Sequence, residues 1–293
     1  MTRRIFRFVL FCGLLVLLAN QTKAQEGIKL RYQYSAGEEL RYKFVMDIVM
    51  SFDMNFPGIE SSAGKPPLMS GQFVGIMKQK TKKIMSNGDA QVTFSYEQIK
   101  MTMEGKTETI PAEKFPEITL FLSNDGKIKD MKWTGGQKIG PGMSDPLSLI
   151  NFEGTGYPSI FPSEPVKVDD TWTLEIPSPM GDGKLNVSSK VLSLNTKIGG
   201  YTAAKIQQDV SGNIGLNIPV PNTANSQGSS MTGTLAINGT GIIYHSIDKG
   251  KLIKTEWKGD LVTAMEVSLP EDNAGSMTMN MEMKYVMYLL PKK

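Results

Sequence analysis

Methionine is the residue type whose spacing in this sequence could support chemistry. The chain has 19 methionines among 293 residues, and four of them alternate near the C-terminus, at Met277, Met279, Met281 and Met283. Thioether sulfurs are soft ligands that select Cu(I). Same-face residues of a strand lie ~7 Å apart, which two flexible methionine side chains can bridge around an ion. The run has three interpretations: core packing, the lining of an apolar cavity and, third, a copper site.

The side chains most often used in catalysis are scarce. The chain has one histidine, His245, and one cysteine, Cys12. A Ser-His-Asp triad would need His245 as its base, yet this residue lies in an expected strand, where a hydrogen-bonded structural histidine is the simpler interpretation. The sequence contains neither a Gly-x-Ser-x-Gly elbow nor a Gly-x-x-x-x-Gly-Lys phosphate loop. These counts also exclude the usual zinc sites built from histidine and cysteine.

Carboxylates are the remaining candidates for acid–base chemistry. Asp47 and Asp53 share one phase of an expected strand, and Glu38–Glu39 and Asp169–Asp170 lie in expected turns. Acid–base catalysis needs carboxylates that converge in a cleft, and this spacing indicates solvated faces and turns instead. We therefore predict that the protein is not an enzyme, with no catalytic residue, no cofactor and no metal site.

The first 24 residues predict export. Arg3, Arg4 and Arg7 precede an apolar run over 8–19, and a short polar stretch ends at Ala24. This order is typical of a secretory signal peptide, here cleaved after Ala24. The apolar run is shorter than the ~20 residues that span a bilayer. We expect a periplasmic or extracellular protein with no transmembrane anchor after cleavage.

Removal of residues 1–24 changes the charge balance. The segment contains four of the 32 basic residues and none of the 29 acidic ones, which leaves 28 against 29 and a net charge of −1. A nearly neutral chain has no general attraction to nucleic acid. The mature chain also lacks cysteine, so it needs no disulfide in an oxidising compartment.

The segment 42–56 has the clearest periodicity. Apolar side chains occupy every second position from Tyr42 to Phe56, and most positions between them are polar. Period two over this length predicts a strand with one apolar face. At ~3.3 Å per residue the strand runs on the order of 50 Å, so it must bend across a barrel or feed two sheets.

The partner of this strand is expected after a loop at 57–70. If Met54 lies opposite Phe73 and Met50 opposite Met77, one register satisfies both faces of the pair. A change of phase near Gln98 in the following strand predicts a β-bulge.

Turn residues place further hairpins at 86–89, 124–126 and 249–250. Residues 144–150 are the one modest helical candidate, and 134–145 and 219–230 have loop compositions. The sequence thus predicts an all-β protein whose long antiparallel strands form a curved sheet, open barrel or sandwich from two related halves, with little helix.

A similarity between two segments of the sequence suggests the two halves. Residues 124–133 (NDGKIKDMKW) resemble residues 248–257 (DKGKLIKTEW), matching Gly126 with Gly250 and Trp133 with Trp257. Chance similarity of two hairpins is the alternative, because turns favour Asn, Asp and Gly in any case. The predicted organisation is a signal peptide at 1–24, a first β half at 25–156 and a second β half at 157–293.

Three segments of the second half carry a resemblance to a known family. FPSEPVKVDDTWTLEIP, IGGYTAAKIQQ and GTGIIYHSIDKGKL resemble exported bacterial proteins of unknown function that share a Val-Gly-Asp-Thr-Trp strand start and a late Phe-Asp-x-x-x-Gly-x-Leu hairpin. Asp169 replaces the glycine here, and Ser246-Ile247-Asp248 departs from the aromatic-Asp pattern. The resemblance implies an envelope location and β architecture, and it supplies no catalytic residue. At the level of fold alone, the long strands are similar to the open barrels of lipoprotein carriers.

Same-phase methionine and aromatic residues of several strands define a candidate binding face. We expect it to bind an apolar small molecule or lipid, or to serve only as core. The alternative, from a different class of function, is a structural or partner-binding β-module without a cavity. Its loops 57–70 and 219–230 would contact another envelope protein. The residues assigned to the face are Phe44, Met46, Met50, Phe52, Met54, Met77, Met101, Met103, Met279, Met281, Met283 and Tyr285.

Overall fold

The structure is a computed structural model and describes residues 27–55, 68–115, 117–134, 160–177, 182–219, 230–268 and 274–291. These residues form antiparallel strands and one short 3-10 helix, η1 (Ala112–Lys114). The strands are β1 (Glu39–Asn55), β2 (Leu68–Ile84), β3 (Ala90–Met103), β4 (Lys106–Ile110), β5 (Glu117–Leu122), β6 (Ile128–Thr134), β7 (Thr171–Pro177), β8 (Gly183–Ile198), β9 (Tyr201–Pro219), β10 (Ser230–Ser246), β11 (Lys251–Ser268) and β12 (Ala274–Leu289).

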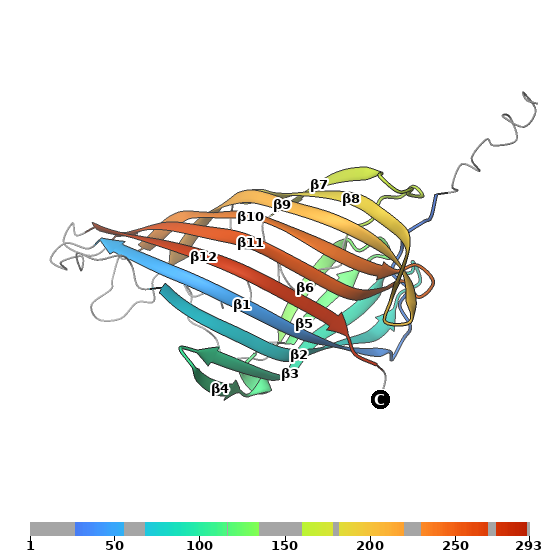
Figure 1. Cartoon of the computed structure of the whole chain (residues 1–293), viewed down its shortest axis with the longest axis horizontal. Helices are drawn as coiled ribbons and strands as arrows, with labels where there is room; N and C mark the ends of the chain where they lie inside the picture. Colours follow the sequence, from blue (N-terminus) through green and yellow to red (C-terminus); the bar gives the residue numbers. More distant parts are fainter. Residues whose placement is uncertain are drawn as a thin grey trace, which may run out of the picture.

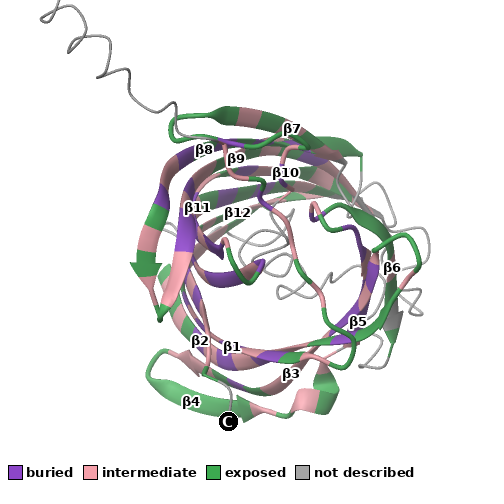
Figure 2. Cartoon of the chain, turned by 90° about the vertical axis from the view of Figure 1, so that its right-hand side faces the viewer, coloured by how far each residue is buried: buried purple, intermediate pink, exposed green. Residues whose placement is uncertain are grey.

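All twelve strands belong to one sheet with the order β6-β5-β3-β2-β1-β12-β11-β10-β9-β8-β7, and β4 pairs with β3 beside this path. The sheet curls strongly, so that its two edge strands, β6 and β7, approach the same side of the molecule (Figure 2). Among the described residues β6 and β7 do not pair, and the curled sheet is therefore open. The prediction of an all-β protein with a curved sheet of long strands is confirmed.

The alternation in the sequence decides which face of the sheet is buried. Along β1, Tyr42, Phe44 and Met46 lie on the concave inner face and are buried, whereas Lys43 and Asp47 lie on the outer face. The pairing of β1 with β12 keeps this phase. Apolar inner residues thus face each other across the strands, and the outer face carries mostly charged and polar side chains, with valines at Val45, Val49 and Val286.

The expected hairpins are present. Turns connect β2 to β3 at 85–89, β5 to β6 at 123–127 and β10 to β11 at 247–250. The bulge expected near Gln98 is also confirmed. Gln98 pairs with Ile76 and Tyr96 pairs with Met77, so that Glu97 is the extra residue of β3.

The expected register of β1 and β2 is wrong. Met46, not Met54, lies opposite Phe73, and Tyr42, not Met50, lies opposite Met77. The true register differs by eight residues. An even shift leaves every side chain on the same face, so the pattern of apolar and polar residues cannot distinguish the two registers.

Parts of the expected loops turn out to be strand. Residues 68–70 open β2, Thr134 ends β6, Pro219 ends β9 and Ser230 begins β10. The helical candidate at 144–150 and the remaining loop residues, 57–67, 135–145 and 220–229, lie outside the described residues.

The segment 27–38 lies across one end of the curled sheet (Figure 1, dark blue). Its backbone bonds to Val166 beyond one edge, to Asn124 in the β5–β6 turn and to Gly250 in the β10–β11 turn. Leu30 packs there against Phe161, in a cluster that includes residues of β8 and β9. This segment covers one end of the curled sheet, which we call the closed end; no described segment lies across the opposite end, near Met54, and we call it the open end.

Candidate functional site

The inner face of β1 changes character from the closed end to the open end. Tyr42 is 1% exposed and Ile48 6% exposed, Met50 and Phe52 are half-buried, and Met54 is 53% exposed. All five share one phase of one strand. The same apolar face therefore serves as core near the closed end and reaches solvent near the open end.

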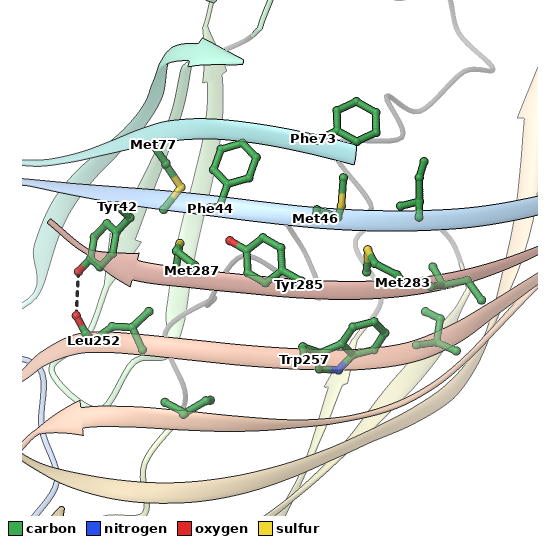
Figure 3. Close-up of a cluster of buried hydrophobic side chains, with 14 of the residues drawn as sticks. Tyr42, Phe44, Met46, Phe73, Met77, Leu252, Trp257, Met283, Tyr285 and Met287 are labelled. Carbon is green, nitrogen blue, oxygen red and sulfur yellow. Dashed lines mark hydrogen bonds between the residues drawn. The ribbon is translucent and has the colours of Figure 1, made fainter. Parts of the chain in front are cut away.

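The packed part of the inner face lies between β2, β1, β12 and β11 (Figure 3). Phe44 stacks on Tyr285 with ring centroids 6.3 Å apart. The Tyr42 hydroxyl donates to the Leu252 carbonyl at 3.3 Å. Burial raises the pKa of the Tyr42 and Tyr285 hydroxyls, so both stay protonated. This part belongs to the buried core.

Trp257 of β11 packs beside these residues (Figure 3). Its indole lies against Gly239, Gly241 and Gly259, whose missing side chains leave space for the flat ring. The Trp257 Nε1–H and the Tyr285 hydroxyl are both buried without a hydrogen-bond partner among the described residues. Burying two such donors is unfavourable by roughly 1–3 kcal/mol each unless something bonds to them.

The structure brings the predicted binding residues onto one face but divides them by burial. Five are buried and belong to the core: Phe44, Met46, Met77, Met283 and Tyr285. Seven lie toward the open end and are half-buried or exposed: Met50, Phe52, Met54, Met101, Met103, Met279 and Met281. The second group is the candidate binding face, and we call it the open-end face.

Three further methionines extend the open-end face. Sequence reasoning missed two of them, and it recognised the third, Met277, in the alternating run without assigning it to the face. Met69 lies opposite Met50 on β2, and Met277 of β12 lies between Met54 of β1 and Met265 of β11. All three are half-buried. Met69 and Met265 could have been found only from the strand register, which the alternating pattern leaves undetermined.

The space beneath the segment 27–38 offers little room for a ligand. A partly enclosed space of about 30 Å³ lies between this segment and the inner face, beside Tyr34, Tyr42 and Thr81. That volume is enough for one or two waters, and a water there could satisfy the buried Tyr34 hydroxyl, which has no partner among the described residues.

A larger groove, of about 880 Å³, opens beside residues 35–41 and 289–291. Its charged side chains are engaged with each other. The Arg41 guanidinium donates two hydrogen bonds to the Glu97 carboxylate, one of them with Nε and Oε1 2.8 Å apart. Lys251 forms an ion pair with Glu38. The groove therefore presents paired ions rather than a free charge that would attract an ionic ligand.

His245 has a structural environment. It is 1% exposed, its Nε2 lies 3.0 Å from the Arg31 carbonyl, and its ring contacts Tyr32 and Phe161 edge-on. Burial lowers the pKa of His245 to about 4, so the imidazole is neutral and donates to Arg31 through Nε2–H. It thereby fixes the segment 27–38 to β10.

Within the described ranges, no three histidine, cysteine, aspartate or glutamate side chains cluster as metal ligands would. Nor does that part of the chain include a helix of the length and apolarity needed to cross a bilayer. The predicted side chains of the open-end face are six thioethers and one aromatic ring, Phe52, which suit apolar contacts and soft cations.

Comparison with known proteins adds no family. No protein-family model matches the sequence, and no curated protein matches it. The family resemblance of the second half is thus not confirmed.

Among solved structures, DynF from the dynemicin biosynthesis pathway of Micromonospora chersina is 10% identical, with 92% of each chain covered and a TM-score of 0.23. OpdQ of Pseudomonas aeruginosa is 9% identical, with 87% of this chain and 98% of that chain covered and a TM-score of 0.17. At these TM-scores neither structure supports an inference about this chain.

Proposed function

We propose that the protein is an exported, non-enzymatic binder of an apolar small molecule or lipid, which it holds on the open-end face. The observation that carries the proposal is the burial gradient along β1, from Tyr42 at 1% exposure to Met54 at 53% on one continuous apolar phase. Export is supported by the signal-peptide pattern of residues 1–24.

The physical argument concerns uncovered apolar surface. Burying apolar surface contributes roughly 25 cal/mol per Å², so a ligand that covers the half-exposed methionines and Phe52 is stabilised by the water it displaces. Methionine suits such a face because its unbranched side chain adapts to ligands of different shape. The charged outer face of the same strands, with Lys43 and Asp47, offers no comparable apolar surface.

The test compares two lysine substitutions at the same depth of the sheet. Met281 faces Met50 on the inner side, and Asn280 faces Ser51 on the outer side of the same strand pair. We expect Met281→Lys to weaken binding of the fluorescent probe N-phenyl-1-naphthylamine at least tenfold, and Asn280→Lys to leave it unchanged. Thermal unfolding of both variants checks that each is folded.

Extraction of natively purified protein with organic solvent provides the second arm. Lipid that co-purifies with the native chain and is lost from Met281→Lys supports the proposal. An empty extract together with a probe that does not bind would overturn it. The chain would then be a structural or partner-binding β-module.

A further inference from the structure

The open-end face carries two straight rows of methionine that cross three strands each. In the first row Met69 of β2 lies opposite Met50 of β1, which lies opposite Met281 of β12. In the second row Met54 of β1 lies opposite Met277 of β12, which lies opposite Met265 of β11. We call them the Met50 row and the Met277 row.

Direct cross-strand neighbours are closer than same-strand neighbours. Residues opposite each other have Cβ atoms about 4.5–5.5 Å apart, whereas alternate residues of one strand lie ~7 Å apart. The two outer side chains of a row can therefore lean over the central one and bring three sulfur atoms around one point.

A glycine supplies further space beside the Met50 row. The sulfur of Met103 occupies the position where a Gly71 side chain would lie. Gly71 is two residues from Met69 on the same face of β2 and lies opposite Ile48 of β1. A fourth thioether is thus directed from β3 toward the same strands.

From this arrangement we propose that each row is a binding site for one soft monovalent cation, Cu(I) or Ag(I), coordinated by three thioethers. Neutral sulfur ligands prefer such ions to hard divalent ones. The partial exposure of the rows keeps the cost of desolvating a single charge low, compared with a site in the packed core. The ion is held without change of oxidation state.

Among the described residues, the other half-buried methionines of this face, Met101, Met103 and Met279, have no methionine directly opposite: Met101 faces Phe73, Met103 faces Gly71, and Met279 faces Phe52 and Thr263. Cys12, the one cysteine, lies in the expected signal peptide, and His245, the one histidine, is buried at the closed end against Arg31. Met46, Met283 and Met287 are buried in the packed core and belong to neither row.

The experiment replaces methionine by leucine, which keeps volume and apolarity but removes the sulfur. Silver nitrate is titrated by calorimetry, in chloride-free buffer, into the full chain carrying Cys12→Ser. We expect two bound ions. One should be lost in Met50→Leu/Met69→Leu/Met281→Leu, the other in Met54→Leu/Met265→Leu/Met277→Leu, and both in the sixfold variant. A matched control replaces Met85 and Met131, which lie in the β2–β3 turn and on β6, and should keep both.

Methyl-13C labelling of methionine gives an independent readout, since coordination shifts the methyl signals of the row that binds. No silver binding to the parent chain, or unchanged binding in the sixfold variant, would overturn the proposal. Loss confined to one threefold variant would retain it for that row and overturn it for the other. Binding of N-phenyl-1-naphthylamine is measured separately on the parent chain without silver, so failure of the cation proposal is distinguishable from failure of the proposed apolar-ligand function.

Discussion

His245 is a buried neutral imidazole, and its titration links folding to pH. Its pKa is lowered to about 4 in the folded chain by burial, compared with about 6.5 for an unperturbed histidine. The unfolded chain therefore binds the proton more readily between these values. The stability that His245 contributes as a neutral group is fully present above pH 6.5 and is lost as the pH falls toward 4.

We predict that the free energy of unfolding falls by about 2 kcal/mol between pH 7.5 and pH 5.0 because of this residue. Urea unfolding at several pH values measures the change. His245 is the only histidine, so the decrease should be largely absent from His245→Gln, whatever the stability of that variant at pH 7.5. A variant that keeps the full decrease would show that His245 is not the group responsible.

Trp257 depends on the glycines beneath it. A Cβ at Gly239 would overlap the indole, so Gly239→Ala should displace the ring and destabilise the fold by about 1–3 kcal/mol. In a Trp257→Leu background the same substitution should cost much less. Gly215→Ala is the control, since the nearest atom to its added Cβ, the Asp182 carbonyl oxygen, lies 3.3 Å away. Equal effects of Gly239→Ala in both backgrounds would contradict this packing.

At the scale of the elements, period-two alternation was sufficient to predict β1, its apolar face and the bulge at Glu97, because each depends on local phase. The pairing of β1 with β2 depends on how many residues the connection takes up, and an even error leaves the faces unchanged. For this reason the sequence identified Met50, Phe52 and Met54 as face residues but missed Met69 and Met265, which join them only through register.

The register can be tested with cysteine pairs, since Cys12 is the one cysteine of the sequence. Asp47 lies opposite Gln72, and their side chains are hydrogen-bonded at 2.8 Å. With Cys12→Ser as background, Asp47→Cys/Gln72→Cys should form a disulfide readily, because opposed residues satisfy its geometry. Asp47→Cys/Lys80→Cys, which the alternative register would join, should stay reduced. Efficient oxidation of the second pair would show that β1 and β2 are paired differently.

At the scale of the whole molecule, the similarity between the two hairpins gains a structural detail. Each hairpin has a β-bulge in its second strand, and the extra residue is Lys129 in β6 and Ile253 in β11. These two positions are 124 residues apart, which is also the offset between the two similar sequences. The two predicted halves nevertheless share one sheet, because β1 pairs with β12 along 14 residues of each, Tyr42–Asn55 and Ser276–Leu289. Common ancestry of the halves stays a prediction.

Closure of one end is the feature that the sequence could not supply. The segment 27–38 alternates apolar and polar residues from Ile28 to Tyr34, as a strand of the sheet would. Its backbone bonds nevertheless reach residues as distant in sequence as Val166 and Gly250, and no local pattern predicts those partners. Where this segment lies decides which part of an otherwise uniform apolar face becomes core and which part stays open. The candidate binding face was therefore predictable as a phase of several strands, but not in its extent.

Because one sheet joins both halves, we expect them to unfold together. Met46 is 0% exposed and lies between Tyr285 of β12 and Phe73 of β2, so Met46→Ala should destabilise the fold by about 2–5 kcal/mol. Hydrogen exchange should then accelerate in β2 and β3 and, to a similar degree, in β9 and β10, although neither of the last two strands pairs with β1. Val49→Ala, on the outer face of β1 at 39% exposure, should change exchange little in either half. Acceleration confined to β2 and β3 would mean that the second half is stable by itself and that the β1–β12 pairing does not couple the two.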